Sequence, residues 1–374
     1  MSKITVMDSR IEKMAQVLIN YSTAVKPGER VLIRATSPVA EPLVQALYQE
    51  ALRAGAQAFT YIHLRDEDTL ALEATQQADL LGAANPMLEL MYETCQVIIR
   101  IDASENPLAM VDYAPELQRA VVAGKRVLMK HQMEREGNGM LRRCTVLFPT
   151  QGLAQRAGMS LQRYEDFVYR ACKLHLSDPV AAWQEVKTMQ QRFVDYLVGK
   201  KLLHARGSNI DMTVSIEGRT FLNACGDSNF PDGEIFTGPV EDGVNGWVNF
   251  TYPAYYSDNR VSGIKLRFEN GLITQATATE NEAFLLSVLD SDPGARRLGE
   301  FAIGSNYDIQ RWTGSILFDE KIGGTLHMAV GQGYPQTGSV NTSAVHWDMI
   351  CDMQADGEIS ADGEVFYRNG QFLI

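Results

Sequence analysis

The sequence predicts two domains of different class: an α/β domain with a mainly parallel sheet over residues 1–200, and an α+β, β-rich domain over residues 201–374. A chain of 374 residues exceeds the roughly 250–300 residues at which a single core stops growing. Apolar strand segments alternate with helical segments in the first part, whereas β-type runs between Gly, Asn and Asp turns prevail after residue 209. The charge also differs between the two parts. Residues 1–200 hold 23 basic and 23 acidic side chains, whereas residues 201–374 hold 11 basic and 23 acidic ones.

The first domain is predicted from strands of four to seven residues with amphipathic helices between them. Ser9 and Glu12 form a capping-box signal that starts the first helix, and Pro27 with Gly28 ends it. A second helix covers residues 41–53. The alternation implies a largely parallel sheet with both faces covered. The expected strands are residues 30–34, 58–64, 97–101, 126–129 and 144–148.

A helical stretch over residues 160–199 is expected to connect the domains, with one helix starting at Ser160 and another at Pro179. The second domain then contains β-type runs and a single helix. Hairpin turns are expected at Glu217-Gly218 and Asn270-Gly271. The runs are residues 210–216, 263–268 and 325–330, and the helix is residues 280–289.

Several classes of protein are excluded by composition. With 45% apolar and 21% charged residues the chain is neither disordered nor fibrous. No apolar run approaches the roughly 18–20 residues that cross a bilayer, and no secretory signal precedes the first helix, so we expect a cytoplasmic protein. The net charge of −12 disfavours nucleic acid. Five scattered cysteines without a CxxC pair are expected to be reduced and mostly buried.

Residue types that can hold a metal ion gather within residues 227–348. The sharpest pattern is His346-Trp347-Asp348, because residues i and i+2 of an extended strand point to the same side, where one cation could contact both. Isolated triplets of this kind are also common by chance, with the histidine in a core and the aspartate capping a turn. His327 lies in a strand-type segment and, taken alone, fits a structural histidine as well.

Three glutamates and a tyrosine allow the same two interpretations. Glu234 follows a Phe-Pro-Asp-Gly turn signature, which also suits a solvated turn residue. Glu300 falls in a segment of helical character, where an exposed charge is the ordinary interpretation. Glu320 suits a surface ion pair, and Tyr334 suits an aromatic anchor in a loop. Individually, none of these residues indicates a function.

Together, their surroundings resemble the aminopeptidase T and aminopeptidase S family. Six separated segments carry the resemblance in the same order, and residues 148–160 (FPTQGLAQRAGMS) extend it over nearly the whole chain. The six segments are residues 230–237 (FPDGEIFT), 238–246 (GPVEDGVNG), 295–304 (ARRLGEFAIG), 317–327 (LFDEKIGGTLH), 333–335 (GYP) and 343–350 (SAVHWDMI).

The resemblance implies a dinuclear metalloaminopeptidase that removes N-terminal residues from peptides, with its metals in the β-rich domain and a homodimeric assembly around an enclosed interior. It implies two divalent ions per chain, of Zn, Co, Mn or Mg, with Glu300, Glu320 and Tyr334 as candidate catalytic residues. Carried over motif by motif, the ligands fall on Glu234, Glu300, His327, Tyr334, His346 and Asp348.

General chemistry is consistent with such a set. Two divalent ions roughly 3.5–4 Å apart can share a carboxylate and lower the pKa of water from 15.7 towards about 7. Carboxylate and imidazole ligands suit Zn²⁺, Co²⁺ or Mn²⁺. Tyrosine, with an ordinary pKa of roughly 10, needs a metal contact or else donates to a developing oxyanion.

Two other functions remain open at this point. Some ring-cleaving Fe(II) dioxygenases that act on dihydroxypyridines resemble the same scaffold, and His327, His346 and Asp348 would suit their two-histidine, one-carboxylate site. A mononuclear site has no need of Glu234 and Glu300, whose presence favours the peptidase. A non-catalytic metal-binding protein with this fold is the third possibility, and the complete set of ligand types argues against it.

Overall fold

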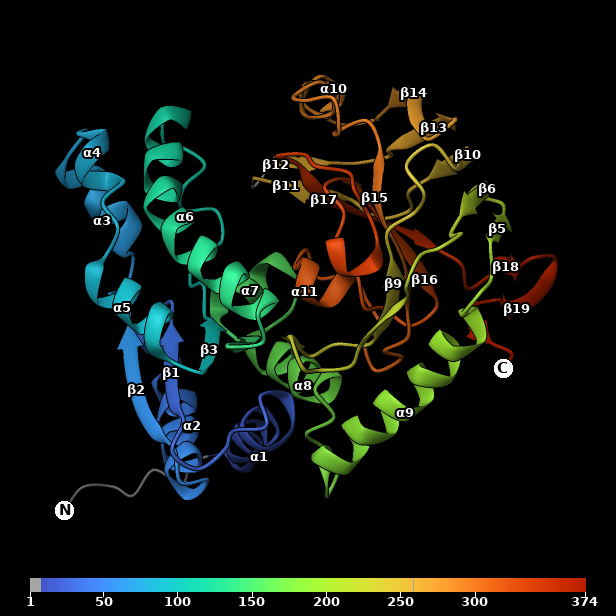
Figure 1. Ribbon diagram of the computed structural model, residues 1–374. Coiled ribbons are helices and arrows are strands. Elements are labelled where there is room, and N and C mark those ends of the chain that lie inside the picture. The colour runs from blue at the N-terminus through green and yellow to red at the C-terminus, as the bar shows by residue number, and fades with distance from the viewer. Residues whose placement is uncertain (1–7, 258) are drawn as a thin grey trace, which may run out of the picture. The chain divides into compact units, whose positions relative to one another are not determined.

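The computed structural model describes residues 8–257 and 259–374, which divide into two compact units (Figure 1). The first unit comprises residues up to Ala182 together with Gly226–Pro231, and the second comprises Trp183–Cys225 and Asp232–Ile374. Each unit has a sheet architecture of its own, and each is described by itself.

The first unit is built on a five-stranded sheet in which each neighbouring pair is parallel, in the order β2-β1-β3-β4-β8. Helices between successive strands make the parallel pairing possible. The sequence prediction of a mainly parallel α/β domain is therefore confirmed. The strands are β1 (Arg30–Ala35), β2 (Gln57–Ile62), β3 (Val97–Asp102), β4 (Arg142–Leu147) and β8 (Asn229–Phe230).

Helices cover this sheet because its strands carry apolar side chains on both faces. Leu32 and Ile98 of neighbouring strands belong to one buried cluster with Leu88 and Leu128 of two helices. The helices are α1 (Ser9–Val17) with a π-helical turn at Leu18–Ser22, a 3₁₀ turn at Pro38–Ala40, α2 (Glu41–Arg53), α3 (Glu67–Ala74), α4 (Ala78–Leu81), α5 (Pro86–Thr94), α6 (Pro115–Gly137), α7 (Gln151–Arg156), α8 (Leu161–Ala171) and α9 (Pro179–Leu197), which continues into the second unit.

Two local predictions in this unit are wrong. Residues 126–129 form part of α6 rather than a strand, because a short apolar run cannot be told from one face of a buried helix by its pattern alone. The first helix is capped by Asp8, whose carboxylate accepts a hydrogen bond from the backbone of Arg10, rather than by Ser9. The predicted cap at Ser160 is confirmed, since its hydroxyl accepts from the backbone of Arg163.

The second unit contains two larger antiparallel sheets and a two-stranded ribbon, β11-β12. The eight-stranded sheet has the order β14-β13-β10-β6-β5-β18-β19-β20, and the five-stranded sheet has the order β17-β16-β15-β9-β7. The strands are β5 (Leu202–Gly207), β6 (Ile210–Ser215), β7 (Leu222–Ala224), β9 (Glu234–Thr237), β10 (Val244–Asn249), β11 (Ala254–Tyr256), β12 (Asn259–Val261), β13 (Lys265–Glu269), β14 (Leu272–Thr277), β15 (Leu298–Gly304), β16 (Thr325–Gly331), β17 (His346–Asp352), β18 (Glu358–Ala361), β19 (Glu364–Arg368) and β20 (Gln371–Phe372).

One large apolar core fills this unit, with side chains from both sheets and from α9 and α10 (Glu282–Leu289). Along β16, the alternate residues Leu326, Met328 and Val330 belong to this core. On β17 the same is true of Trp347 and Met349. Because successive side chains of a strand point to opposite faces, the residues between them face away from the core. The second unit is thus β-rich, as predicted.

The two predicted hairpins have different outcomes. Asn270 and Gly271, with φ of 49° and 76°, join the paired antiparallel strands β13 and β14, so this prediction is confirmed. Glu217-Gly218 does not make a hairpin, because β6 and β7 belong to different sheets. All five cysteines are buried thiols, as expected. Within residues 8–257 and 259–374, no helix has both the length and the apolar character that a membrane span requires.

Candidate metal centre

The face of the five-stranded sheet that turns away from the core carries five of the six predicted metal ligands. Glu300, on β15, and Asp348, on β17, lie in register with Ala329 of the strand between them. His327 lies two residues before Ala329 and therefore on the same face. The small alanine side chain leaves room between the two carboxylates. Because side chains alternate along each strand, one face of the sheet packs in the core and the other carries the candidate ligands.

Glu300 corrects the sequence interpretation most clearly. The sequence placed this candidate metal ligand in a segment of helical character, where an exposed charge was the ordinary alternative. It lies instead in β15, a strand whose seven residues are all buried. A strand buried on both faces shows no polar–apolar alternation, so its pattern resembles that of a helix. Only 4% of Glu300 and 4% of Glu234 is exposed, and both interpretations as solvated residues are wrong.

The two histidines stand close to three carboxylates. His327 Nε2 lies 3.3 Å from Glu234 Oε2 and 3.4 Å from Glu300 Oε1. His346 Nε2 lies 3.4 Å from Glu300 Oε2 and 3.7 Å from Asp348 Oδ2. Glu300 therefore directs one oxygen to each histidine, which is the arrangement expected of a carboxylate shared by two cations.

Three overlapping groups of ligand-type atoms result, each with its atoms within 4.8 Å of one another. Glu300 belongs to two of them, and the third brings Glu320 to the centre. The groups are Glu234–Glu300–His327, Glu300–His346–Asp348 and Glu320–His327–Asp348. Five of the six predicted ligands and the candidate catalytic Glu320 thus lie in one cluster.

Backbone carbonyl groups orient both imidazole rings. His327 Nδ1 lies 3.0 Å from the carbonyl oxygen of Glu320, and His346 Nδ1 lies 2.8 Å from that of Gln332. Each carbonyl accepts a hydrogen bond from Nδ1, which leaves Nε2 of each ring directed at the carboxylates. Metal-binding histidines are commonly held in this way, because the second hydrogen bond fixes the tautomer and the ring orientation.

The donor set fits divalent cations. Glu234 Oε2 and Asp348 Oδ1 are buried and accept no hydrogen bond. Buried polar atoms are almost always satisfied, and each unsatisfied one costs roughly 1–3 kcal/mol. Carboxylate oxygens and imidazole nitrogens at this density are the ligands that Zn²⁺, Co²⁺ and Mn²⁺ accept.

The titration behaviour reflects the concentrated negative charge. Burial lowers the pKa of His327, but Glu234 and Glu300 outweigh burial and raise it to about 10. The pKa of His346 is likewise raised to about 10, by Asp348 and Glu300 against the effect of burial. Burial raises the pKa of Glu300, but its hydrogen bonds with the two histidines lower it to about 2. The centre therefore favours positive charge between its carboxylates.

Lys321 is a member of this centre that the sequence analysis missed. Its side chain is 1% exposed, and its Nζ lies 2.5 Å from both Glu234 Oε1 and Glu320 Oε1 and 3.6 Å from Asp232 Oδ1. A surface ion pair was the ordinary alternative for the candidate catalytic residue Glu320, whereas its pair with Lys321 is largely shielded from solvent. A charged segment between strands carries no sign of burial in its sequence, although the neighbouring Gly323 and Gly324 indicate tight packing.

Tyr334 lies at the edge of the same cluster. Its ring packs edge-on against His346, with centroids 5.3 Å apart, and against Phe236 at 5.4 Å. Burial, Glu300 and Asp348 all raise the pKa of its hydroxyl, which therefore stays protonated as a hydrogen-bond donor. The structure thus brings the sixth predicted ligand beside the histidines.

A small aromatic-walled pocket of about 30 Å³ adjoins Asp348. Tyr255 and Trp312 form part of its wall, with their rings stacked at 6.1 Å between centroids. Ile316 adds an apolar side, and the buried Asp319 lies at the lining as well. The sequence could not locate this pocket, because its walls come from three segments about 30 to 60 residues apart along the chain.

A fourth group of ligand-type atoms lies in the first unit, where Glu89 and Glu93 of α5 face His131 of α6. His131 Nε2 is 3.2 Å from Glu89 Oε1 and 3.6 Å from Glu93 Oε1. These side chains are 25–46% exposed. This group has the character of a surface ion pair and contrasts with the buried cluster of the second unit.

Residues 7–372 match the family model described as thermophilic metalloprotease (M29). The chain belongs to this family. It is accordingly a metallopeptidase, and the buried cluster on the five-stranded sheet is a candidate site for its metal. This match favours the peptidase among the three functions considered from the sequence, and it does not support the dioxygenase or the non-catalytic alternative.

Two named relatives match this chain over nearly their whole lengths. The chain is 28% identical to aminopeptidase 2 of Geobacillus stearothermophilus, with 98% of both chains covered. It is also 28% identical to aminopeptidase T of Thermus thermophilus, with 97% of this chain and 98% of that one covered.

Two solved structures share the fold. The AmpT structure from Thermus thermophilus superimposes with a TM-score of 0.84 at 24% identity, covering 99% of this chain and all of that one. The 2,5-dihydroxypyridine dioxygenase of Pseudomonas putida KT2440 reaches a TM-score of 0.55 at 15% identity, with 98% of each chain covered. At these identities the superpositions show the fold alone.

Proposed function

We propose that this M29 peptidase is an aminopeptidase that removes the N-terminal residue of peptides with the help of two divalent ions. The observation that carries the proposal is the position of Glu300, which directs one oxygen to His327 and the other to His346. A single ion beside one histidine would engage only one of the two Glu300 oxygens, whereas two ions would engage both. The names of the full-length relatives support the exopeptidase activity.

In this proposal the six ligands are the residues that the sequence resemblance implied. Glu234 and His327 would hold one ion, His346 and Asp348 the other, and Glu300 would bridge them. Tyr334 completes the set, either as a ligand or as a donor to the oxyanion. Bound ions would polarise the scissile carbonyl group and lower the pKa of water to about 7.

The protein's own groups then supply proton transfer and charge balance. Glu320 reaches the centre with one oxygen on Lys321, so its other oxygen is available to carry a proton from water to the leaving amine. Lys321 is a positioning residue that holds Glu234 and Glu320 at fixed angles. The acidic surroundings would attract a free α-ammonium group, so we expect the enzyme to require an unblocked N-terminus.

The aromatic wall of the pocket beside Asp348 is proposed to contact the side chain of the N-terminal residue. Tyr255 and Trp312 suit a planar or branched apolar group that lies against this wall, because the pocket itself, at about 30 Å³, holds little more than water. The homodimer, the cytoplasmic location and the choice among Zn, Co, Mn and Mg remain predictions from the sequence.

Metal analysis combined with hydrolysis assays tests the proposal. We expect two divalent ions per chain and cleavage of Leu-anilide, with N-acetyl-Leu-anilide left intact. One ion per chain in the fully active enzyme, or equal rates on both anilides, would contradict it. Size-exclusion chromatography with light scattering tests the homodimer.

A further inference from the structure

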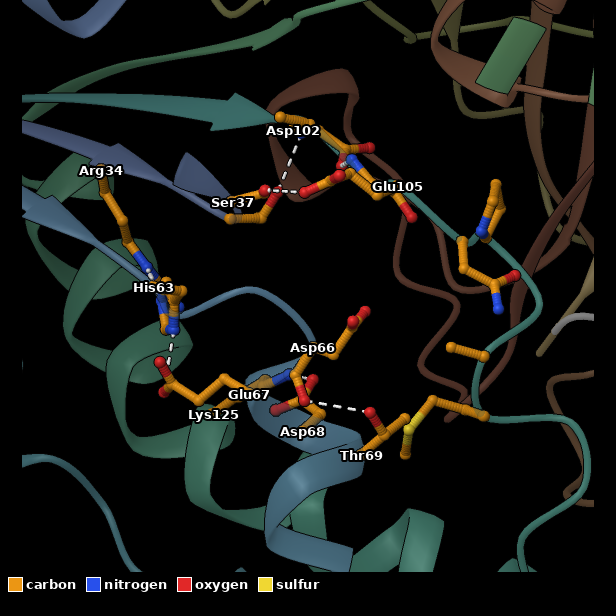
Figure 2. A pocket seen from close by; sticks show the side chains of 17 residues that line it. Arg34, Ser37, His63, Asp66, Glu67, Asp68, Thr69, Asp102, Glu105 and Lys125 are labelled. Atoms are coloured by element: carbon orange, nitrogen blue, oxygen red, sulfur yellow. Dashed lines mark hydrogen bonds and ion pairs between the residues drawn. The ribbon is translucent and has the colours of Figure 1, made fainter. Parts of the chain in front are cut away.

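The first unit contains a polar pocket of about 280 Å³ at the carboxyl ends of β1, β2 and β3 (Figure 2). The strand order β2-β1-β3-β4 reverses direction at β1, so the neighbouring ends of β1 and β3 form a topological switch point. Open parallel sheets bind ligands in the crevice at such a point, because the loops after the two strands diverge there. The pocket therefore lies at the position where sheets of this topology commonly bind ligands.

Residues that follow each of the three strands line the pocket, and hydrogen bonds fix its walls. Arg34 Nε donates to His63 Nε2 at 3.0 Å, and His63 Nδ1 lies 3.1 Å from Glu67 Oε1. Opposite them, Ser37 donates to Glu105 Oε1 at 2.5 Å. In Figure 2 these groups surround an open space. The walls are preorganised, which lowers the entropic cost of binding.

The pocket carries a surplus of negative charge. Five carboxylates line it against two permanent cations, Arg34 and Lys125, which leaves a formal charge of −3. Burial and Arg34 lower the pKa of His63, so this ring does not offset the surplus at neutral pH. The five are Asp66, Glu67, Asp68, Asp102 and Glu105.

Some of these carboxylate oxygens have no partner within the protein. Glu67 is occupied by His63 and by the backbone of Leu64. Asp66, by contrast, makes no side-chain cap to α3 and no side-chain hydrogen bond or ion pair in the described chain, and Figure 2 shows it directed towards the space. Its φ of 56° is unusual for a residue other than glycine. Glu105 lines the pocket as well, and its side-chain contacts with Ser37 and Arg65 both use Oε1, so that Oε2 is available to a ligand.

The chemistry selects a class of ligand. Phosphates and other anions are disfavoured by the net charge. A bare metal ion is disfavoured because, among the described residues, no three ligand atoms of this pocket approach within 4.8 Å. The volume is close to the roughly 300 Å³ lower bound of small-molecule sites. A cation that carries several N–H donors fits both the size and the dispersed carboxylates.

We propose that this pocket binds a small organic molecule through a primary ammonium group, which donates to Asp66 and Glu105. Free amino acids or dipeptides and polyamines are two sources of this chemistry. The site is built from residues of the first unit alone, and the proposal does not rest on the proposed peptidase mechanism.

Calorimetry on the metal-loaded full-length protein tests the proposal with leucine, spermidine and tetramethylammonium as probes. Asp66→Asn removes the charge while asparagine still tolerates a positive φ, so the fold is preserved. Glu105→Gln keeps an acceptor for Ser37 and Arg65 and serves as a second variant. Asp79→Asn, an exposed residue of α4 outside the pocket, is the matched control.

We expect leucine or spermidine to bind at millimolar concentrations or tighter, with both pocket variants weakening the affinity on the order of tenfold and the control leaving it unchanged. Tetramethylammonium has no N–H donor and should not bind. Binding of leucine alone identifies amino acids as the source, and binding of spermidine alone identifies polyamines. The proposal is overturned if neither probe binds, or if Asp66→Asn binds both as the wild type does.

A second leucine site at the metal centre is recognised by its response to the variants. Leucine binding there is lost in Glu300→Gln and kept in Asp66→Asn. Leucine binding that only Glu300→Gln removes would therefore count against the pocket and leave the proposed peptidase function intact.

Discussion

The two units each gather carboxylates and histidines, but at different density. In the second unit the groups around Glu300 and His327 are almost fully buried, and their ligand atoms lie within 4.8 Å of one another. In the first unit the pocket around Asp66 and His63 is larger, and most of its carboxylates already have partners. Spacing and burial, rather than residue type, thus distinguish the candidate metal centre from the proposed site for an organic cation.

The largest effect is expected from Glu300→Gln. The amide cannot serve as a charged bridge between the groups of His327 and His346, so turnover should fall on the order of 10³-fold and metal content should fall with it. Anilide hydrolysis and elemental analysis measure both. Glu89→Gln, in the exposed acidic group of the first unit, is the control and should change neither. A variant that keeps more than a tenth of wild-type turnover when saturated with metal would contradict the role of Glu300.

Metal removal should abolish activity and lower the melting temperature, because ions that bind only the folded state add to its stability. Dialysis against a chelator followed by calorimetry measures the shift, and Zn²⁺, Co²⁺ and Mn²⁺ added singly should restore both properties to different degrees. Glu234→Gln should reduce the size of the shift, whereas Asp66→Asn should not. Unchanged turnover in protein shown to be free of metal would contradict a catalytic role for metal ions in the second unit.

Lys321→Met should weaken metal retention by roughly 10–100-fold, the usual effect of removing a group that orients ligands. It also leaves Glu234, Glu320 and Asp232 without their buried cation, so unfolding should become easier by roughly 3–5 kcal/mol. Denaturant unfolding and competition with a chelating dye separate the two effects. Lys265→Met, on an exposed strand position, is the control. If metal retention stays normal while stability falls, Lys321 is structural only.

The smallest effect is expected from Trp312→Ala. Loss of the aromatic wall beside Asp348 should raise KM for Leu- and Phe-anilides roughly tenfold, since apolar pocket contacts are worth about 1–3 kcal/mol. Ala-anilide should be hydrolysed almost as before. An equal decline for all three substrates would place the side-chain pocket elsewhere.

The sequence predicted the features that depend on local pattern. The parallel strands of the first unit and the strand positions of His327, His346 and Asp348 all follow from periodicity. Glu300 was predicted in a helix because a strand with both faces covered has no alternation to detect. The family resemblance, rather than the pattern, supplied its role.

Lys321 and the pocket around Asp66 depend on tertiary structure. A lysine in an Asp-Glu-Lys segment that runs into Gly323-Gly324 has the composition of a surface loop, and only the packed chain shows that it is 1% exposed. The lining of the pocket comes from segments about 30 to 90 residues apart, which meet because parallel strands end at the same edge of a sheet. Neither feature leaves a periodic signal.

The alternation along β16 and β17 has an evolutionary consequence. Leu326, Met328 and Val330 fill the core, and His327 reaches the metal centre from between them. Inserting or deleting one residue within either strand would exchange these faces, so imidazoles would enter the apolar interior while leucine and methionine would enter the site. These two strands should therefore diverge among relatives by substitution only, and length changes should accumulate in the loops that join them.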